Sequence, residues 1–161
     1  MPIPGGPRPS HLPARRLPEV AEQVQGAIHA PGDTSEVMVS GVSLSSRTVH
    51  PGDLYAALPG QRAHGADYAQ DALAAGAVAV LTDPAGAERA AGTGLPVILV
   101  EEPRARLGAL AAWLYGRPAE RLLTLGVTGT NGKTTTTFLL DGALRRLGRH
   151  TGLVGTIEVR V

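Results

Sequence analysis

The chain has 161 residues, 43% of them apolar, and a formal net charge of +1 at pH 7. This length suits one domain or a small pair, and the near-neutral charge gives no basis for a protein that binds nucleic acid or a membrane surface. The absence of cysteine excludes disulfides and thiolate metal sites and is typical of a cytoplasmic protein. No apolar run approaches the ~20 residues needed to cross a bilayer, so we expect no membrane insertion.

Residues 1–36 are predicted to form a flexible tail. Residues 1–18 contain six prolines and three arginines with little apolar periodicity. Proline removes backbone donors and favours extended chain, so this composition is typical of disorder. A short helix is allowed within the segment, around residues 19–28.

Residues 37–117 alternate between strand and helix patterns. A helix is predicted at 66–75, closed by Gly76, and another begins at Pro103, where apolar residues recur at i, i+3, i+4 and i+7. This alternation indicates an α/β layer structure with a partly parallel sheet. Short apolar runs predict strands at 37–42, 54–58, 78–81 and 96–100.

A second unit, residues 118–161, begins with an apolar run at 122–127 that predicts a strand. A tight glycine-containing loop follows, then a helical pattern as far as Gly148, then a second strand pattern at 151–156. Strand, glycine loop, lysine and helix are the order of parts in a phosphate-binding loop. The general pattern has glycine where this chain has Val127, so the loop is a variant, and an ordinary strand–turn–helix with a surface lysine is the alternative interpretation.

In this loop, Lys133 would place a positive charge against a phosphate, and the Thr134 hydroxyl suits Mg²⁺. A single strand–helix–strand is too small for a nucleotide-binding domain, which usually needs about 100 residues or more. We therefore interpret residues 118–161 as the start of a truncated Rossmann-like ATPase domain, and the chain as part of a longer enzyme. We expect the isolated 161-residue chain to be inactive.

The loop from Thr128 to Thr135 resembles the ATP loop of the Mur ligase and folylpolyglutamate synthetase superfamily. The preceding unit is similar to the N-terminal domain of Mur ligases of the MurE type. This similarity rests on Leu44-Ser45-Ser46-Arg47, on the run from Pro51 to Gly60, on His64-Gly65-Ala66-Asp67-Tyr68 and on the run from Ala75 to Leu81. It covers about residues 37–161.

The resemblance implies two binding sites. A small N-terminal α/β domain at 37–117 would bind the UDP-sugar, through Leu44 and Ser46 at the uridine and through the loop after the next strand at the nucleotide and diphosphate. That loop supplies Gln61, Arg62 and Ala63. The ATP site would be formed by Gly129, Thr130, Asn131, Gly132, Lys133, Thr134 and Thr135, with Lys133 catalytic and Thr134 at the metal. Ser45 and His64 stand where the family usually has aspartate.

From the residues alone, Arg62 suits a diphosphate through its planar fork, but a solvated loop arginine is equally compatible. Ser46 suits a uracil or ribose oxygen, although a turn cap is the simpler interpretation. Arg47 is expected to pair with a local carboxylate. The five histidines show no spacing typical of metal ligands.

The reaction implied by the resemblance is ATP-dependent amide formation through an acyl phosphate. The third amino acid, diaminopimelate or lysine, would be added to UDP-N-acetylmuramoyl-L-Ala-D-Glu during peptidoglycan precursor synthesis, by a cytoplasmic monomer that uses ATP and Mg²⁺. The alternatives are a MurF-type ligase, a folylpolyglutamate synthetase-type ligase and a non-catalytic UDP-sugar-binding module.

Overall fold

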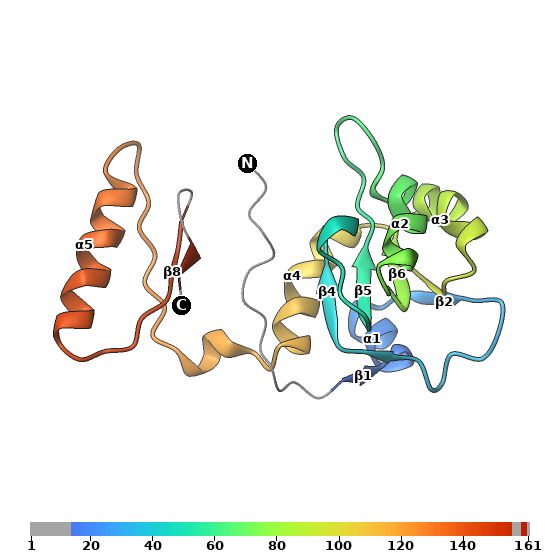
Figure 1. Ribbon diagram of the computed structural model, residues 1–161, viewed down its shortest axis with the longest axis horizontal. Helices are drawn as coiled ribbons and strands as arrows, with labels where there is room; N and C mark the ends of the chain where they lie inside the picture. The colour runs from blue at the N-terminus through green and yellow to red at the C-terminus, as the bar shows by residue number, and fades with distance from the viewer. Residues whose placement is uncertain (1–13, 156–158, 161) are drawn as a thin grey trace. The chain divides into compact units, whose positions relative to one another are not determined.

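The computed structural model describes residues 14–155 and 159–160. They form two compact units, divided between Arg121 and Leu122. The first unit is built on a five-stranded sheet, and the second contains one long helix and a short hairpin (Figure 1). The division predicted from the sequence lies at residues 117/118.

The sheet of the first unit has the strand order β2-β7-β6-β5-β4. The four strands from β4 to β7 run parallel to their neighbours, whereas β2 pairs antiparallel with β7 at one edge. The α/β class with a partly parallel sheet is therefore confirmed. The strands are β2 (Ala27–His29), β4 (Gly41–Ser43), β5 (Asp53–Ala56), β6 (Ala79–Thr82) and β7 (Val97–Leu99). A separate antiparallel pair joins β1 (Arg15–Arg16) to β3 (Met38–Val39).

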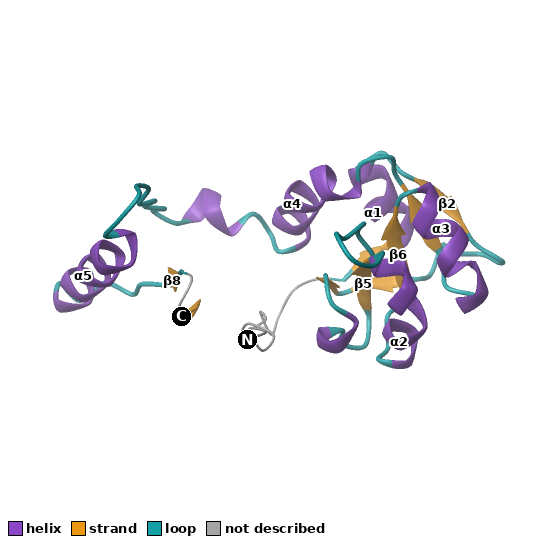
Figure 2. Ribbon diagram, turned by 90° about the horizontal axis from the view of Figure 1, so that it is seen from above, coloured by secondary structure: helices purple, strands orange, loops and turns teal. Residues whose placement is uncertain are grey.

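Helices cover both faces of this sheet (Figure 2). The helices α1 (Leu17–Val24) and α4 (Pro103–Leu114) pack on one face, and α2 (Ala69–Ala74) and α3 (Pro84–Ala90) on the other. Neighbouring residues of one strand divide between the two cores: Leu54 faces α1 and α4, and Tyr55 faces α2 and α3. Burial on both faces explains why these strands are nearly continuous apolar runs.

Short 3₁₀ turns connect the main elements. They are η1 (Ser46–Thr48), η2 (Gly65–Tyr68), η3 (Ala91–Thr93) and η4 (Pro118–Arg121). The predicted strands at 54–58, 78–81 and 96–100 are confirmed as β5, β6 and β7, and the predicted helices as η2–α2 and α4. The predicted strand at 37–42 is instead two strands in different sheets, because the Ser40 N–H between them donates to the Gly52 carbonyl, outside both ladders (2.9 Å).

The prediction of a flexible tail as far as residue 36 is wrong for residues 17–29. Leu17, Val20 and Val24 of α1 are fully buried against the sheet, and β2 forms an edge strand. Pro18 does not interrupt α1, because it occupies the first turn, where a backbone N–H has no partner within the helix. Residues 1–13 lie outside the described residues.

The second unit contains α5 (Lys133–Arg146) and a hairpin of β8 (Leu153–Val154) and β9 (Val159–Arg160). The helix after the glycine loop is therefore confirmed. The strand predicted at 122–127 is wrong: this segment forms no strand and is mostly exposed, with Leu123 at 84% exposure. A strand needs a hydrogen-bonded neighbour, and none of the described residues pairs with it. Across 14–155 and 159–160, none of the helices has the length and apolar character required to span a bilayer.

The core of the first unit gives a stability test with a matched control. Leu110 of α4 is 0% exposed in the core against the sheet, whereas Leu44 is exposed. We expect Leu110→Ala to lower the free energy of unfolding by about 2–5 kcal/mol, because it leaves a cavity. Leu44→Ala should change it by less than about 0.5 kcal/mol. Urea unfolding measures both, and equal losses would contradict the assignment of the core.

Candidate functional site

The parallel strands bring three connecting segments to one edge of the sheet. The strands β4, β5 and β6 point the same way, so the residues that follow them meet at their carboxyl ends. These segments are residues 44–48, 57–64 and 83–86. Figure 1 shows the connection after β5 projecting beyond the end of that strand. In open α/β sheets this edge is where ligands bind.

The segment after β4 is a hydrogen-bonded turn. The Ser43 hydroxyl donates to the Ser45 carbonyl (2.9 Å) and lies 2.9 Å from the Thr48 hydroxyl. The Ser45 hydroxyl accepts the Arg47 N–H and so caps η1, as an aspartate would at this position. The turn holds Leu44 in solvent at 61% exposure, beside a half-buried Ser46. Of the two residues predicted at the uridine, Leu44 is therefore fully accessible at this edge of the sheet and Ser46 is partly accessible.

The segment after β5 forms one wall of a shallow surface cavity of about 350 Å³. All three residues predicted at the diphosphate, Gln61, Arg62 and Ala63, line it and are exposed. The cavity also contains Arg89 of α3, whose guanidinium pairs with the Asp67 carboxylate at 2.7 Å. This ion pair holds the pKa of Asp67 below its usual value. Sequence reasoning missed Arg89, because nothing in the chain order places α3 beside this loop.

Both ends of the β5 loop are fixed by buried groups. The Thr82 hydroxyl donates to the Ala57 carbonyl (2.7 Å), and the Gly65 N–H donates to the Leu58 carbonyl (2.8 Å). The Tyr55 hydroxyl donates to the Gly65 carbonyl (2.8 Å). Burial raises the pKa of Tyr55, so the hydroxyl keeps its proton as a donor. The His64 ring completes this arrangement through a 3.0 Å hydrogen bond to Asp83.

In the second unit, two glycines of the loop before α5 have positive φ. Gly132 precedes α5 with φ 76° and Gly129 has φ 149°, a backbone region open mainly to glycine. Lys133 is the first residue of α5, and its ammonium donates to the carbonyls of Gly129 and Thr130, the latter at 3.3 Å. The lysine therefore lies across the loop, and the first turn of α5 carries Thr134 and Thr135.

Asp141 fastens α5 to the segment that follows it. Its carboxylate is 7% exposed and accepts hydrogen bonds from the Thr151 hydroxyl (2.6 Å) and the Arg145 guanidinium (3.1 Å). Arg160 of β9 lies 3.5 Å away and stacks over Phe138. The bond from Thr151, followed by the two arginines, holds the pKa of Asp141 below its usual value.

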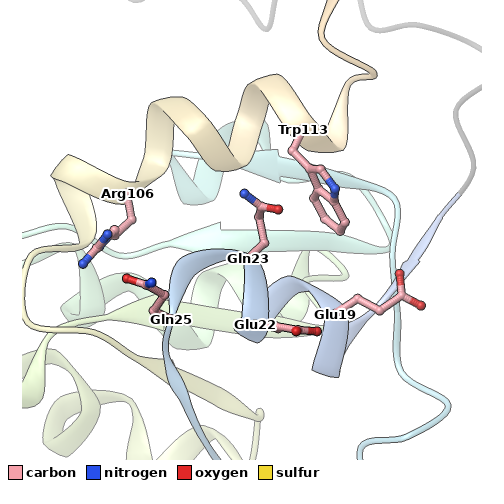
Figure 3. Close-up of a pocket in the computed structure, with 6 residues that line it drawn as sticks. All are labelled: Glu19, Glu22, Gln23, Gln25, Arg106 and Trp113. Carbon is pink, nitrogen blue, oxygen red and sulfur yellow. The ribbon is translucent and has the colours of Figure 1, made fainter.

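A larger cavity, of about 540 Å³, lies between α1 and α4 (Figure 3). Arg106 and Trp113 project from α4, opposite carboxylates and amides from α1 and from Gln25 directly after it. The cavity lies away from the carboxyl ends of the strands, and its charges do not converge on one point. We therefore assign it no part in the site. Its lining residues are Glu19, Glu22, Gln23, Gln25, Arg106 and Trp113.

The first turn of α5 carries one oxygen donor that suits a metal. Within 14–155 and 159–160, no three His, Asp or Glu side chains come together as a metal site would require. Mg²⁺ is commonly held by one protein oxygen together with phosphate oxygens of a nucleotide and water. The Thr134 hydroxyl, in the first turn of α5, fits that chemistry.

Comparison with known proteins supports one family. The model "Mur ligase family, catalytic domain" matches residues 38–115. A UDP-N-acetylmuramoyl-L-alanyl-D-glutamate–2,6-diaminopimelate ligase from Streptomyces avermitilis is 55% identical over 100% of this chain, and one of the same name from Streptomyces coelicolor is 53% identical over 100%. The chain spans 31% of each of these two relatives.

Solved structures agree on the fold. A structure of MurF from Acinetobacter baumannii has a TM-score of 0.66 at 26% identity and covers 84% of this chain and 28% of its own. A structure titled as a 2,6-diaminopimelate ligase of the type above has a TM-score of 0.54 at 27% identity, over 81% of this chain and 26% of its own. Fold similarity therefore extends to both ligase types.

The Asp141 cluster predicts an acid-sensitive attachment of α5. A carboxylate whose pKa is lowered in the folded state stabilises that state above its unfolded pKa, and the stabilisation is lost as the pH falls through the folded pKa. We expect the bonds from Thr151 and Arg145 to persist at pH 5 and to be lost only as the pH falls through the lowered pKa of Asp141, below its usual value of about 4. Amide exchange in α5 and the hairpin from pH 6 to pH 2, expressed as protection relative to the unstructured chain at each pH, measures this.

The Asp141→Asn variant serves as the control, since it removes the titrating group. Its protection against exchange should be lower already at pH 6 and should change little further in acid. An unchanged acid profile in this variant would contradict the role of Asp141.

Proposed function

Because the chain belongs to the Mur ligase family, we propose that it is the N-terminal part of an ATP-dependent ligase that adds 2,6-diaminopimelate to UDP-N-acetylmuramoyl-L-alanyl-D-glutamate. The observation that carries this proposal is the 55% identity, along the whole chain, to a relative of that name. The amino-acid sequence alone left diaminopimelate and lysine open, and the relatives' names favour diaminopimelate. The reaction belongs to peptidoglycan precursor synthesis, in the cytoplasm.

The first unit would bind the UDP-sugar at the carboxyl edge of its sheet. Leu44 offers an apolar surface to the uracil ring, and Ser46 offers a hydroxyl to the uracil or ribose. Gln61 and Ala63 flank Arg62 on the lining of the same cavity, where Arg62 would pair with the diphosphate through its planar fork. The five residues lie at one edge of the sheet, four of them exposed and Ser46 half-buried, and this supports the assignment.

The second unit would bind ATP. The N–H groups of the loop and the start of α5 favour an anion, and Lys133 would stabilise negative charge on the transferred phosphoryl group. Thr134 would hold Mg²⁺, which neutralises phosphate charge when bound. The substrate carboxylate would be phosphorylated by ATP, and the amine of the amino acid would displace phosphate from the acyl phosphate. The loop residues proposed for ATP are Gly129, Thr130, Asn131, Gly132, Lys133, Thr134 and Thr135.

A MurF-type ligase is the main competing function. Its support is the TM-score of 0.66 to the Acinetobacter baumannii structure, above the 0.54 for the diaminopimelate ligase structure. Both structures share only 26–27% identity with the chain, whereas the curated diaminopimelate ligases share 53–55%. The higher sequence identity favours the diaminopimelate ligase. Another related structure is titled as a UDP-N-acetylmuramoylalanyl-D-glutamyl-2,6-diaminopimelate–D-alanyl-D-alanyl ligase. That ligase and the diaminopimelate ligase therefore differ in the substrate that supplies the amine.

The UDP-sugar site is tested by Arg62→Ala in the 161-residue chain. Arg62 lies on an exposed loop, so its loss should leave the thermal unfolding midpoint unchanged. We expect the affinity for UDP-N-acetylmuramoyl-L-Ala-D-Glu to fall about 10-fold, equivalent to about 1.4 kcal/mol, because a charge-assisted bond to phosphate is lost. The affinity of Arg62→Lys should lie between those of Arg62→Ala and the wild type. Calorimetric titration measures this, and unchanged affinity would rule out Arg62 as a contact.

The ATP site is tested in a protein that contains this chain together with the remaining length of its relatives. We expect it to form an amide from diaminopimelate, but not from D-alanyl-D-alanine, in the presence of ATP. Lys133→Ala should reduce the rate about 100-fold or more, since it removes charge stabilisation at the phosphoryl group, and should weaken ATP binding. UDP-sugar binding should remain close to that of the wild type. Equal loss of both ligands would contradict two separate sites.

A further inference from the structure

His64 stands where the loop after β5 ends and η2 begins, and both of its ring nitrogens are engaged. Nδ1 accepts the Ala66 N–H at 3.0 Å, and Nε2 lies 3.0 Å from Oδ1 of Asp83. A backbone N–H can only donate, so Nδ1 carries no proton and the ring donates from Nε2 to the carboxylate. The side chain is 8% exposed. His64 thus combines a local cap with a bond to a distant segment.

Asp83 connects this ring to the next strand and helix. It follows β6 directly and caps α3, because the same Oδ1 atom accepts the Gly86 N–H at 2.8 Å. A Cβ atom at Gly86 would lie 2.5 Å from Cε1 of His64, so only glycine leaves room for the ring. The ring is therefore packed against α3 as well as hydrogen-bonded to its cap.

This connection joins two of the segments at the ligand-binding edge. The loop after β5 and the turn after β6 are separated by α2 in the chain, and the pair His64–Asp83 bridges them. Together with the Gly65 bond to Leu58, it fixes the end of the loop while residues 60–63 remain exposed. The segment that carries Arg62 is thus held at its base.

We propose that His64 is a positioning residue of the UDP-sugar site: through Asp83 it holds residues 60–63 in the conformation that binds the diphosphate. This rests on the proposed function, in which Gln61, Arg62 and Ala63 contact that group. His64 also lines the cavity that these residues line, and both of its ring nitrogens are already engaged by Ala66 and Asp83, so we assign the ring a positioning role. It acts by reducing the conformational entropy that the loop loses on binding.

Asparagine at position 64 separates the two roles of the ring. Its Oδ1 atom lies one bond beyond Cγ, as Nδ1 does in histidine, so it can still accept the Ala66 N–H. The side chain is too short to reach Asp83. His64→Asn therefore keeps the cap of η2 and removes only the bond across to α3, whereas His64→Ala removes both. Asp83→Asn is the conservative variant, because its amide oxygen can accept from both His64 and Gly86.

The experiment measures the dissociation constant for UDP-N-acetylmuramoyl-L-Ala-D-Glu in the 161-residue chain, together with amide exchange at Gly65. We expect His64→Asn to weaken binding about 10-fold and to speed Gly65 exchange, because the loop must order on binding. Asp83→Asn should stay within about threefold of the wild type, since both bonds remain possible. Val24→Ala, in the core on the other face of the sheet, should lower stability without changing affinity.

Two results would overturn the positioning role. One is an unchanged affinity and Gly65 exchange rate in His64→Asn. The other is a fall in affinity that simply follows lost stability, so that Val24→Ala binds as poorly as His64→Asn at an equal unfolding midpoint. Failure of the wild-type chain to bind the UDP-sugar would instead overturn the proposed function, and the exchange rate at Gly65 would still report whether His64 holds the loop.

Discussion

The parallel pairing of β4, β5, β6 and β7 is the constraint on which the candidate UDP-sugar site depends. Because the strands run the same way, every chain segment that leaves them starts at one edge. Burial of both faces then fixes the register, since a shift by one residue would exchange the core contacts of Leu54 and Tyr55. The positions of Leu44, Arg62 and Asp83 at that edge follow from this register and not from contacts between them.

Local sequence signals predicted much of this fold. The unbroken apolar run of β6 predicts that the strand is buried on both faces. Gly76 (φ 99°) follows the end of α2 and closes that helix as a C′ glycine does. The start of α5 at Lys133 follows from Gly132, which adopts the left-handed conformation that precedes it. These features depend on a few adjacent residues, so one sequence is enough to find them.

Features that depend on distant partners were not predictable in the same way. The strand β2 has three residues and exists because β7 offers an edge to it. The apolar run at 122–127 has a composition typical of a strand, but within 14–155 and 159–160 no segment pairs with it. The bond between His64 and Asp83 joins residues 19 positions apart, and neither residue has a local pattern that signals it. The candidate residues at the edge were found through the family resemblance rather than through periodicity.

The contacts of Lys133 have a consequence for which anions its loop can hold. Its ammonium already has the carbonyl dipoles of Gly129 and Thr130 as neighbours. An anion that binds this ammonium must replace its hydrogen bonds to the two carbonyls. The flexible four-carbon side chain allows the ammonium to move away from them while the backbone stays in place. A singly charged, weakly held ion offers little to offset the two lost bonds, whereas a polyphosphate offers several charges at once. In the proposed ATP site, the loop would therefore select anions by charge density before any base or sugar is in contact.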